Sequence, residues 1–245
     1  MTAPARVVLI TGAARRIGAQ IARTLHAAGW SLALHAHHSS DALNTLGFAL
    51  EQARPGSILA LQADLSDPAS AEELVHDALA HFGRLDALVN NASNFFPTPL
   101  GQISAAAFDS LMAVNARAPL LLSQAAAPAL QRQHGAIVNL TDLHATTPKR
   151  EHAAYCAAKA ALAMITQALA LELAPQVRVN AVAPGAILWP EEGKPEAARL
   201  ALMQRTPLAR LGTVEEVAEA VRWLIEDASY LTGQTLGLDG GRPLT

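Results

Sequence analysis

Short apolar runs alternate with helix-length segments along the whole chain. The runs are "RVVLITG", "SLALHAH", "SILALQAD", "LDALVNNA", "GAIVNLTD", "VRVNAVAPG" and "QTLGLDGG". Several of them are almost continuously apolar, as strands that are buried on both faces of a sheet must be. The segments between them are 17–28, 41–53, 69–82, a pair within 104–133, 151–174 and 213–227. Regular alternation of this kind predicts right-handed βαβ units, and hence an α/β fold with a mainly parallel sheet and helices on both faces.

The chain has 245 residues, a length that suits one large α/β domain or two small ones. No internal repeat or linker-like change of composition divides it, so we expect a single domain over residues 1–245. One irregular segment, residues 185–212, is rich in proline and charge and follows the end of a predicted strand. Ligands of open α/β sheets bind at that end of the strands. We therefore predict a substrate lid around residues 186–211, with an ordinary surface excursion as the alternative.

Charge and cysteine content narrow the choice of partners. The net charge is −3 and no cluster of Lys and Arg stands out, so nucleic acid and anionic membranes are not expected as partners. No apolar run approaches the ~20 residues that span a bilayer, and the first residues resemble a strand rather than a secretory signal. Cys156 is the only cysteine, so no intrachain disulfide can form. These features predict a cytoplasmic protein.

The stretch "TGAARRIGAQIA" follows the first predicted strand and opens the first predicted helix. Gly12 permits a tight turn there, and Gly18 lets the helix pack closely and present its N-terminus to a pyrophosphate. Arg16 stands where a central glycine would be usual. Two glycines alone are a weak signal, but their position between the first strand and the first helix favours a dinucleotide cofactor.

The end of the second predicted strand indicates which dinucleotide binds. A cofactor without a 2′-phosphate requires an Asp or Glu there, whereas this chain has "HAHHSS" at residues 35–40. Arg15, His38 and Ser39, with Ser40 as a further candidate, can surround a phosphate with hydrogen-bond donors. We therefore predict NADPH rather than NADH. A metal site on the histidines is the weaker alternative, because strand residues alternate faces and neither cysteine nor a carboxylate cluster accompanies them.

The pattern Tyr-x-x-x-Lys at Tyr155 and Lys159 places a phenol and an ammonium on one face of a predicted helix. A phenol with a pKa of about 10 is a poor acid–base group at neutral pH. An ammonium within about 6 Å favours the phenolate and brings that pKa closer to neutrality. The pair therefore indicates acid–base chemistry at this helix.

Several motifs occur in a fixed order around this pair: the glycine-rich turn, "NNA", "MAVNARAP", "NAVAPG" and "LGLDGG". With them the chain resembles the short-chain dehydrogenase/reductase family over essentially its whole length. The resemblance implies one Rossmann-type, doubly wound domain with a seven-stranded parallel sheet, usually assembled as a homotetramer. It implies that Tyr155 is the proton donor and that Lys159 binds the nicotinamide ribose and modulates the tyrosine. It also implies that Asn115 holds a water in a proton relay.

Asp142 departs from the wider family, in which most members have a serine at this position. A serine hydroxyl can donate to a ketone or alkoxide oxygen, whereas an ionised carboxylate only accepts and repels a developing alkoxide. The carboxylate should also raise the pKa of Tyr155 and keep a proton on the phenol. This arrangement suits a substrate rich in N–H groups that becomes more basic on receiving hydride, such as a cyclic imine.

A narrower resemblance agrees with this interpretation. "TGAARRIG", "LHAHHSS", "NNASNFFPTPL" and the final "DGGRPL", with the Asp142–Tyr155–Lys159 set, are similar to the pteridine reductases, which reduce pterins and sometimes folates with NADPH. The resemblance implies that Phe95 stacks on the pterin and that Arg16 and Ser93 contact both the pterin and the cofactor phosphates. Of the two neighbouring phenylalanines, one is expected in the core. His38 stands where the subgroup often has arginine.

The expected contacts fall into two sets. Those with the cofactor are Gly12, Arg15, Arg16, Ile17, Gly18, His37, His38, Ser39, Asp64, Leu65, Asn91, Ala92, Ser93, Tyr155, Lys159, Pro184 and Gly185. Those with the substrate are Arg16, Ser93, Phe95, Asp142, Tyr155 and Trp189, where Trp189 either lines the pocket or anchors the lid.

Three functions remain open at this stage. The first is NADPH-dependent reduction of a dihydropterin, with dihydrofolate and oxidised pterins as further candidate substrates. The second is a carbonyl reductase acting on 3-oxoacyl or sugar ketones, in which Asp142 is neutral drift. The third is a catalytically idle NADPH-binding protein, which the intact Tyr155–Lys159 pair disfavours.

Overall fold

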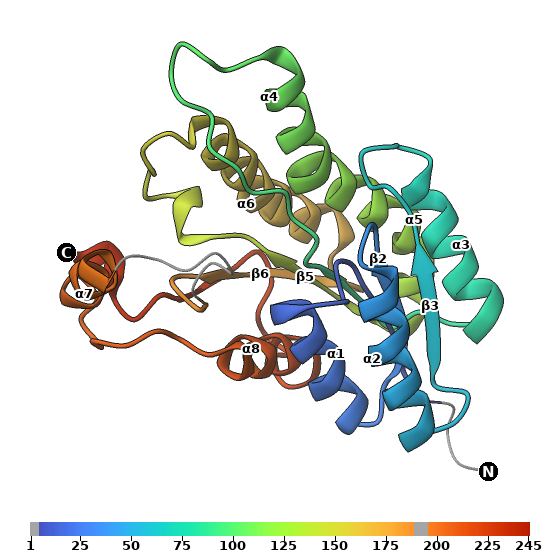
Figure 1. Cartoon of the computed structure of the whole chain (residues 1–245). Coiled ribbons are helices and arrows are strands. Elements are labelled where there is room, and N and C mark those ends of the chain that lie inside the picture. The colour runs from blue at the N-terminus through green and yellow to red at the C-terminus, as the bar shows by residue number, and fades with distance from the viewer. Residues whose placement is uncertain (1–4, 189–195) are drawn as a thin grey trace.

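The computed structural model describes residues 5–188 and 196–245, and its strands form a seven-stranded sheet (Figure 1). The strands are β1 (Val7–Ile10), β2 (Ser31–Ala36), β3 (Ile58–Gln62), β4 (Ala87–Asn90), β5 (Ala136–Leu140), β6 (Arg178–Pro184) and β7 (Thr235–Leu238). Their order is β3-β2-β1-β4-β5-β6-β7, and every pair is parallel. From β1 to β3 each new strand is added on one side of β1, and from β4 to β7 on the other, so the strand order reverses between β1 and β4, as in doubly wound nucleotide-binding folds. The predicted Rossmann-type seven-stranded parallel sheet is confirmed.

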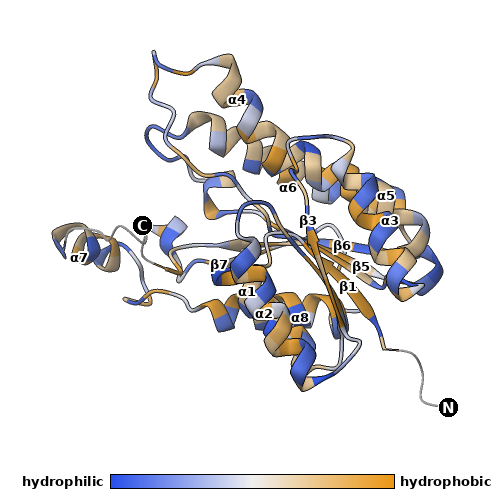
Figure 2. Cartoon of the chain, turned by 45° about the vertical axis from the view of Figure 1, so that its right-hand side comes forward, coloured by the Kyte–Doolittle hydropathy of each residue, from blue (hydrophilic) through white to orange (hydrophobic). Residues whose placement is uncertain are grey.

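Helices cover both faces of the sheet (Figure 1). They are α1 (Arg16–Ala27), α2 (Ser40–Ala53), α3 (Ser70–Phe82), α4 (Ala105–Met112), α5 (Ala118–Gln133), α6 (Ala153–Leu173), α7 (Glu196–Gln204) and α8 (Val214–Glu226). Within β1, Val8 and Ile10 pack into the core shared with α1, α2 and α8. Val7 and Leu9 pack into the core shared with α3, α5 and α6. Successive strand residues thus fill opposite cores, and Figure 2 shows the apolar sheet enclosed between amphipathic helices.

Helix α6 carries Tyr155 and Lys159 and is the most apolar long helix of the described chain. By length and composition alone it could cross a membrane, the only such helix within residues 5–188 and 196–245. A core helix meets the same criteria, and α6 packs directly on β5 and β6. Its buried residues include Leu162, Leu169 and Leu173, so packing in the core accounts for its apolarity.

A buried polar ladder fixes α6 to the sheet. Asn90 and Asn139 lie opposite each other on β4 and β5, and Asn90 Nδ2 donates to Asn139 Oδ1 at 2.8 Å. Asn139 Nδ2 donates to Thr166 Oγ1 on α6 at 2.9 Å, and that hydroxyl donates to the Leu162 carbonyl at 2.9 Å. All three polar side chains are buried. Hydrogen bonds with this geometry hold α6 at one position along its axis.

The predicted lid region contains helix α7, which has no buried residue and lies near the C-terminus of the chain (Figure 1). The Thr245 hydroxyl donates to the Arg205 carbonyl at 2.8 Å, which ties the chain end to this region. Trp189, a predicted substrate contact, lies outside the described residues. The lid therefore stays a prediction.

Candidate active site

The turn between β1 and α1 is packed too tightly for side chains at its glycines. Gly12 has a φ of +64°, a left-handed conformation that glycine adopts freely. A Cβ at Gly18 would lie 2.1 Å from the Gly12 oxygen and 2.6 Å from Asn91 Nδ2. The Asn91 amide donates to the carbonyl oxygens of Thr11 and Gly12, both at 2.9 Å. The structure thus brings Gly12, Gly18 and Asn91 together and holds the turn against the end of β4.

Arg16 begins α1 with a φ of +53°, the conformation expected of a glycine. A residue with a side chain costs about 1–2 kcal/mol more than glycine in this region. The backbone at this position therefore has the left-handed conformation of the central glycine that is usual in this turn, although the residue is an arginine. Arg16 lines the same cavity as Asp142 and Tyr155, and its predicted contact with the substrate stays a prediction.

A first cavity of about 480 Å³ lies at the C-terminal ends of β1, β2, β3 and β4. The predicted cofactor residues that line it are Gly12, Arg15, His37, His38, Ser39, Asp64, Leu65, Ala92 and Ser93. The rings of His37 and His38 are in contact, with 3.5 Å between centroids and a tilt of 31° between planes, and His37 Nε2 lies 3.8 Å from Asp64 Oδ2. Asp64, a predicted cofactor contact at the end of β3, thus brings a carboxylate into the same cavity as the donors expected around the phosphate.

His35 is a positioning residue for which the sequence gave no role. It is 1% exposed, its Nδ1 accepts from the Gly12 N–H at 3.4 Å, and its Nε2 donates to the Ala63 carbonyl at 3.1 Å. Burial lowers its pKa, which agrees with the neutral ring that this bonding requires. His35 thus joins the β1–α1 turn to the end of β3. A polar residue within an otherwise apolar buried strand was the signal that could have identified it.

A second cavity of about 230 Å³ lies beside the first, and Ser93 lines both. The predicted residues around it are Arg16, Ile17, Asn91, Ser93, Asp142, Tyr155, Lys159, Pro184 and Gly185. Ile187 and Leu188, from the start of the predicted lid region, also line it. The predicted acid–base group and the predicted cofactor groups therefore share one cavity.

The Tyr155 hydroxyl donates to Asp142 Oδ2 at 2.8 Å. Asp142 Oδ1 accepts from the His144 N–H at 2.8 Å and so caps the short 3₁₀ turn Leu143–Ala145. Because both carboxylate oxygens are bonded, Asp142 is held in place without a ligand. Lys159, from the next turn of α6, donates to the Leu140 carbonyl at 2.8 Å, and its Nζ lies 5.8 Å from the centre of the Tyr155 ring.

Two opposing effects on the pKa of Tyr155 were expected, from Lys159 and from Asp142, and the net shift is upward. Burial raises the pKa of the Tyr155 phenol, and the charge of Asp142 and the hydrogen bond to it raise it further. A hydrogen bond with Ser93 acts in the opposite direction. Burial lowers the pKa of Lys159 to about 8, with Asp142 opposing the shift. The site therefore holds a protonated phenol beside a carboxylate.

Asn115 lies under Ser93 in a π-helical turn, Ala113–Arg117, that joins α4 to α5. Its Oδ1 accepts from the Ser93 hydroxyl at 2.6 Å, and its Nδ2 donates to the carbonyls of Asn94 at 2.9 Å and Leu111 at 3.0 Å. Such single π turns occur often at functional sites. Asn115 thus positions Ser93 at the boundary of the two cavities, and the predicted water relay stays a prediction.

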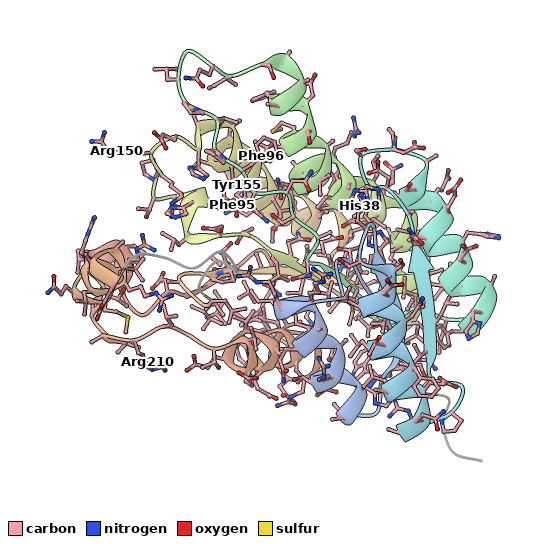
Figure 3. The ribbon with its side chains drawn as sticks, in the orientation of Figure 1. His38, Phe95, Phe96, Arg150, Tyr155 and Arg210 are labelled. Carbon is pink, nitrogen blue, oxygen red and sulfur yellow. The ribbon has the colours of Figure 1, made fainter. Side chains whose placement is uncertain are left out.

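Phe95 and Phe96 differ, as expected. Phe95 is 55% exposed and meets Tyr155 edge-on at 4.8 Å between ring centroids. Its ring also stacks on His152, at 4.7 Å and 25° between planes. Phe96 packs against the core around Leu111 and Tyr155. Figure 3 shows both phenylalanines beside Tyr155. Phe95 is thus placed beside the acid–base pair, and the His152 contact is one that the sequence did not indicate.

The donor set fits a phosphorylated dinucleotide. The glycine turn leaves room for a ligand close to the backbone, and the first turn of α1 contains no acidic residue, so its N-terminus can receive a pyrophosphate. Arg15, His38 and Ser39, which can all donate hydrogen bonds, line the adjoining cavity. Within the described residues, no three His, Cys, Asp or Glu side chains lie close enough together to hold a metal ion.

Comparisons with known proteins agree with this geometry. A family model described as "Enoyl-(Acyl carrier protein) reductase" matches residues 12–242. Pteridine reductase 1 of Leishmania tarentolae is 37% identical over 100% of this chain and 98% of its own.

Relatives with other activities are nearly as similar. The 3-oxoacyl-[acyl-carrier-protein] reductase of Synechocystis is 36% identical over 97% of this chain and 96% of its own. The 3beta-hydroxysteroid dehydrogenase 1 of Eggerthella lenta is 34% identical over 98% and 94% of the two chains. Overall identity therefore does not separate pterin from carbonyl substrates.

Proposed function

The chain belongs to the short-chain dehydrogenase/reductase family of oxidoreductases, and from this premise we propose that it reduces a dihydropterin with NADPH. The observation that carries the proposal is the hydrogen bond from the Tyr155 hydroxyl to Asp142 Oδ2 at 2.8 Å. A carboxylate at this point favours a substrate that donates N–H groups and gains a proton on nitrogen.

The proposed chemistry divides between the cofactor and the acid–base pair. Bound NADPH supplies the hydride. Tyr155 holds a proton at its hydroxyl oxygen, since both burial and Asp142 raise its pKa. Asp142 Oδ2 can accept an N–H of the ring and stabilise the positive charge that develops when the adjacent nitrogen is protonated. The same carboxylate would repel the alkoxide that forms from a ketone. The charge of Asp142 therefore favours a cyclic imine over a ketone as substrate.

Two further residues complete the proposed site. Lys159 keeps one N–H on the Leu140 carbonyl at 2.8 Å, which leaves its other N–H groups for the ribose hydroxyls of the cofactor. Phe95 offers an exposed aromatic ring beside Tyr155. Stacking of a flat heterocycle on such a ring is worth roughly 1–3 kcal/mol by analogy with nucleic-acid bases. NADPH rather than NADH is supported by the donors Arg15, His38 and Ser39 in the first cavity.

A carbonyl reductase is the second candidate, favoured by the 36% identity to the 3-oxoacyl-[acyl-carrier-protein] reductase. The deciding experiment compares NADPH oxidation by the full-length protein with dihydrobiopterin, dihydrofolate and a panel of 3-oxoacyl and sugar ketones. We expect turnover with at least one dihydropterin and little with the ketones. Efficient ketone reduction with no pteridine turnover would overturn the proposal.

We also propose that the protein assembles as a homotetramer and acts in the cytoplasm. Support for assembly comes from exposed apolar side chains on three helices, Phe108 on α4, Leu120 on α5 and Met164 on α6; α4 and α5 both pack against α6. A second copy of the chain would remove them from water. The mass in solution, measured by light scattering, tests the proposal, and a monomeric mass would contradict it.

A further inference from the structure

Phe95, the proposed stacking partner of the substrate, lies against the ring of His152. Their ring centroids are 4.7 Å apart and the two planes differ by 25°, so one face of the phenylalanine is stacked on the imidazole. His152 is 8% exposed, whereas Phe95 is 55% exposed. The covered face of Phe95 therefore rests on a buried side chain, which leaves the opposite face for a flat ligand.

The backbone around His152 is joined to the segment that carries Phe95. The Thr98 N–H donates to the Glu151 carbonyl at 2.5 Å, and Thr98 pairs with His152 in an isolated parallel bridge. Glu151 has a φ of +60°, a left-handed conformation that costs a residue with a side chain more free energy than glycine. Conformations of this kind persist only where the surrounding contacts impose them, and they cluster at functional sites. The backbone beside His152 is thus strained where it holds these two segments together.

The contacts of the imidazole fix its orientation. Nδ1 of His152 lies 2.8 Å from the Arg150 carbonyl oxygen, and because a carbonyl can only accept, Nδ1 carries the proton and donates. His152 directly precedes α6 and comes three residues before Tyr155, whose ring meets Phe95 edge-on at 4.8 Å and 85° between planes. Two rings from the start of α6 therefore hold the Phe95 ring beside the acid–base pair (Figure 3).

We propose that His152 is a positioning residue for substrate binding: its ring supports one face of Phe95, so that the opposite face is already oriented to stack on the substrate. The inference rests on the proposed function, in which that substrate is a dihydropterin. His152 acts through Phe95 and contacts neither the substrate nor the cofactor. An exposed phenylalanine without such support would lose conformational freedom when the ligand binds, and that loss would weaken binding.

The effect should fall on binding rather than on the chemical step. Loss of a stacked aromatic pair changes an equilibrium constant about 2- to 10-fold. The hydrogen bond from the Tyr155 hydroxyl to Asp142 Oδ2 does not involve His152, so the proton donor should be unaffected. Removal of a group that supports only binding raises KM and leaves kcat unchanged. A change in KM without a change in kcat is therefore the signature of this role.

Two variants of His152 separate the ring from its hydrogen bond. His152→Asn removes the ring, keeps an N–H that can donate to the Arg150 carbonyl, and is a favourable residue at the start of a helix. His152→Phe keeps a ring beside Phe95 and loses that donor; Arg150 is exposed, so water can bond its carbonyl instead. Each is combined with Phe95→Ala in a double-mutant cycle, and KM and kcat for dihydrobiopterin are measured with NADPH in the full-length protein. His152→Gln, which also lacks a ring, replaces His152→Asn if the asparagine variant does not fold.

We expect His152→Asn to raise KM about 2- to 10-fold at constant kcat, His152→Phe to stay near the wild type, and His152→Asn to have no further effect once Phe95 is alanine. An unchanged KM in His152→Asn would overturn the inference, as would an equal rise in KM with and without the Phe95 ring. A raised KM in His152→Phe alone would assign His152 to its hydrogen bond and would overturn it too. No pteridine turnover by the wild type would instead overturn the proposed function, so the two failures are distinguishable.

Discussion

Replacing Asp142 with serine should remove a charge from the site while preserving the local fold. Asp142 caps the 3₁₀ turn Leu143–Ala145 by accepting from the His144 N–H, and serine is an equally good capping residue. The bond that is lost is the one from the Tyr155 hydroxyl to Asp142 Oδ2 at 2.8 Å. The variant therefore tests the carboxylate rather than the stability of the loop.

The size of the effect follows from that bond. A hydrogen bond to a charged group is worth about 1.5–3 kcal/mol, and each 1.36 kcal/mol changes a rate tenfold. If this interaction stabilises the transition state, kcat/KM for a dihydropterin should fall about 10²-fold, the lower end of a general-acid contribution. Turnover of ketones should stay constant or rise, because the repulsion of a developing alkoxide is gone.

A second measurement reads the tyrosine directly. The chain contains two tyrosines, and Tyr230 is fully exposed, so a Tyr230→Phe background leaves Tyr155 as the only phenol to titrate by ultraviolet absorbance. Because the Asp142 charge raises the pKa of Tyr155, Asp142→Ser should lower it, and Asp142→Asn should do the same. Unchanged dihydropterin turnover in Asp142→Ser, with a lowered tyrosine pKa, would refute the assigned role.

Three further variants probe the rest of the site. Gly18→Ala should destabilise the fold by about 1–3 kcal/mol and abolish tight NADPH binding, because the added Cβ would lie 2.1 Å from the Gly12 oxygen. A melting temperature within a degree of that of the wild type would contradict this. Phe95→Ala should weaken pterin binding by roughly 1–3 kcal/mol with little change in the free energy of unfolding, whereas Phe96→Ala should mainly destabilise the fold. Equal changes in the steady-state kinetics of the two variants would count against the stacking role of Phe95. Burial lowers the pKa of Lys159 to about 8 in the folded protein, so above pH 8 the unfolded chain binds more protons than the folded one. The free energy of unfolding should therefore rise between pH 8 and about 10.5, by at most roughly 1.4 kcal/mol per pH unit. Chemical denaturation of Lys159→Met should show no such rise.

The sheet and the helix that carries Tyr155 and Lys159 could be predicted because their signals are local. A strand buried on both faces must be apolar at successive residues, as in "VRVNAVAPG", and Tyr155 and Lys159 share a face at any helical geometry. The turn at Gly12 and Gly18 was predictable for the same reason. Even the departure at Arg16 was visible, and its φ of +53° shows that the backbone still follows the glycine pattern.

What the sequence did not show depends on contacts between distant segments. The carboxylate of Asp64 reaches His37 only because β2 and β3 are neighbours in parallel register, so both strand ends face one cavity. The stacking of Phe95 on His152 joins the segment after β4 to the start of α6. Neither pair has a characteristic spacing along the chain, so no periodicity or motif predicts it.

The hydrogen-bonded row of Asn90, Asn139 and Thr166 explains how Tyr155 is held at a fixed position along the α6 axis relative to the sheet. Purely aliphatic side chains would allow a helix to shift along its axis relative to the sheet at little cost. A shift by one helical turn moves every side chain by 5.4 Å. Amide-to-hydroxyl bonds are directional and match at a single setting, even though Asn90 Oδ1 is left without a partner. An engineer who filled this row with leucine or valine could obtain a firmer protein in which the phenol no longer meets the carboxylate.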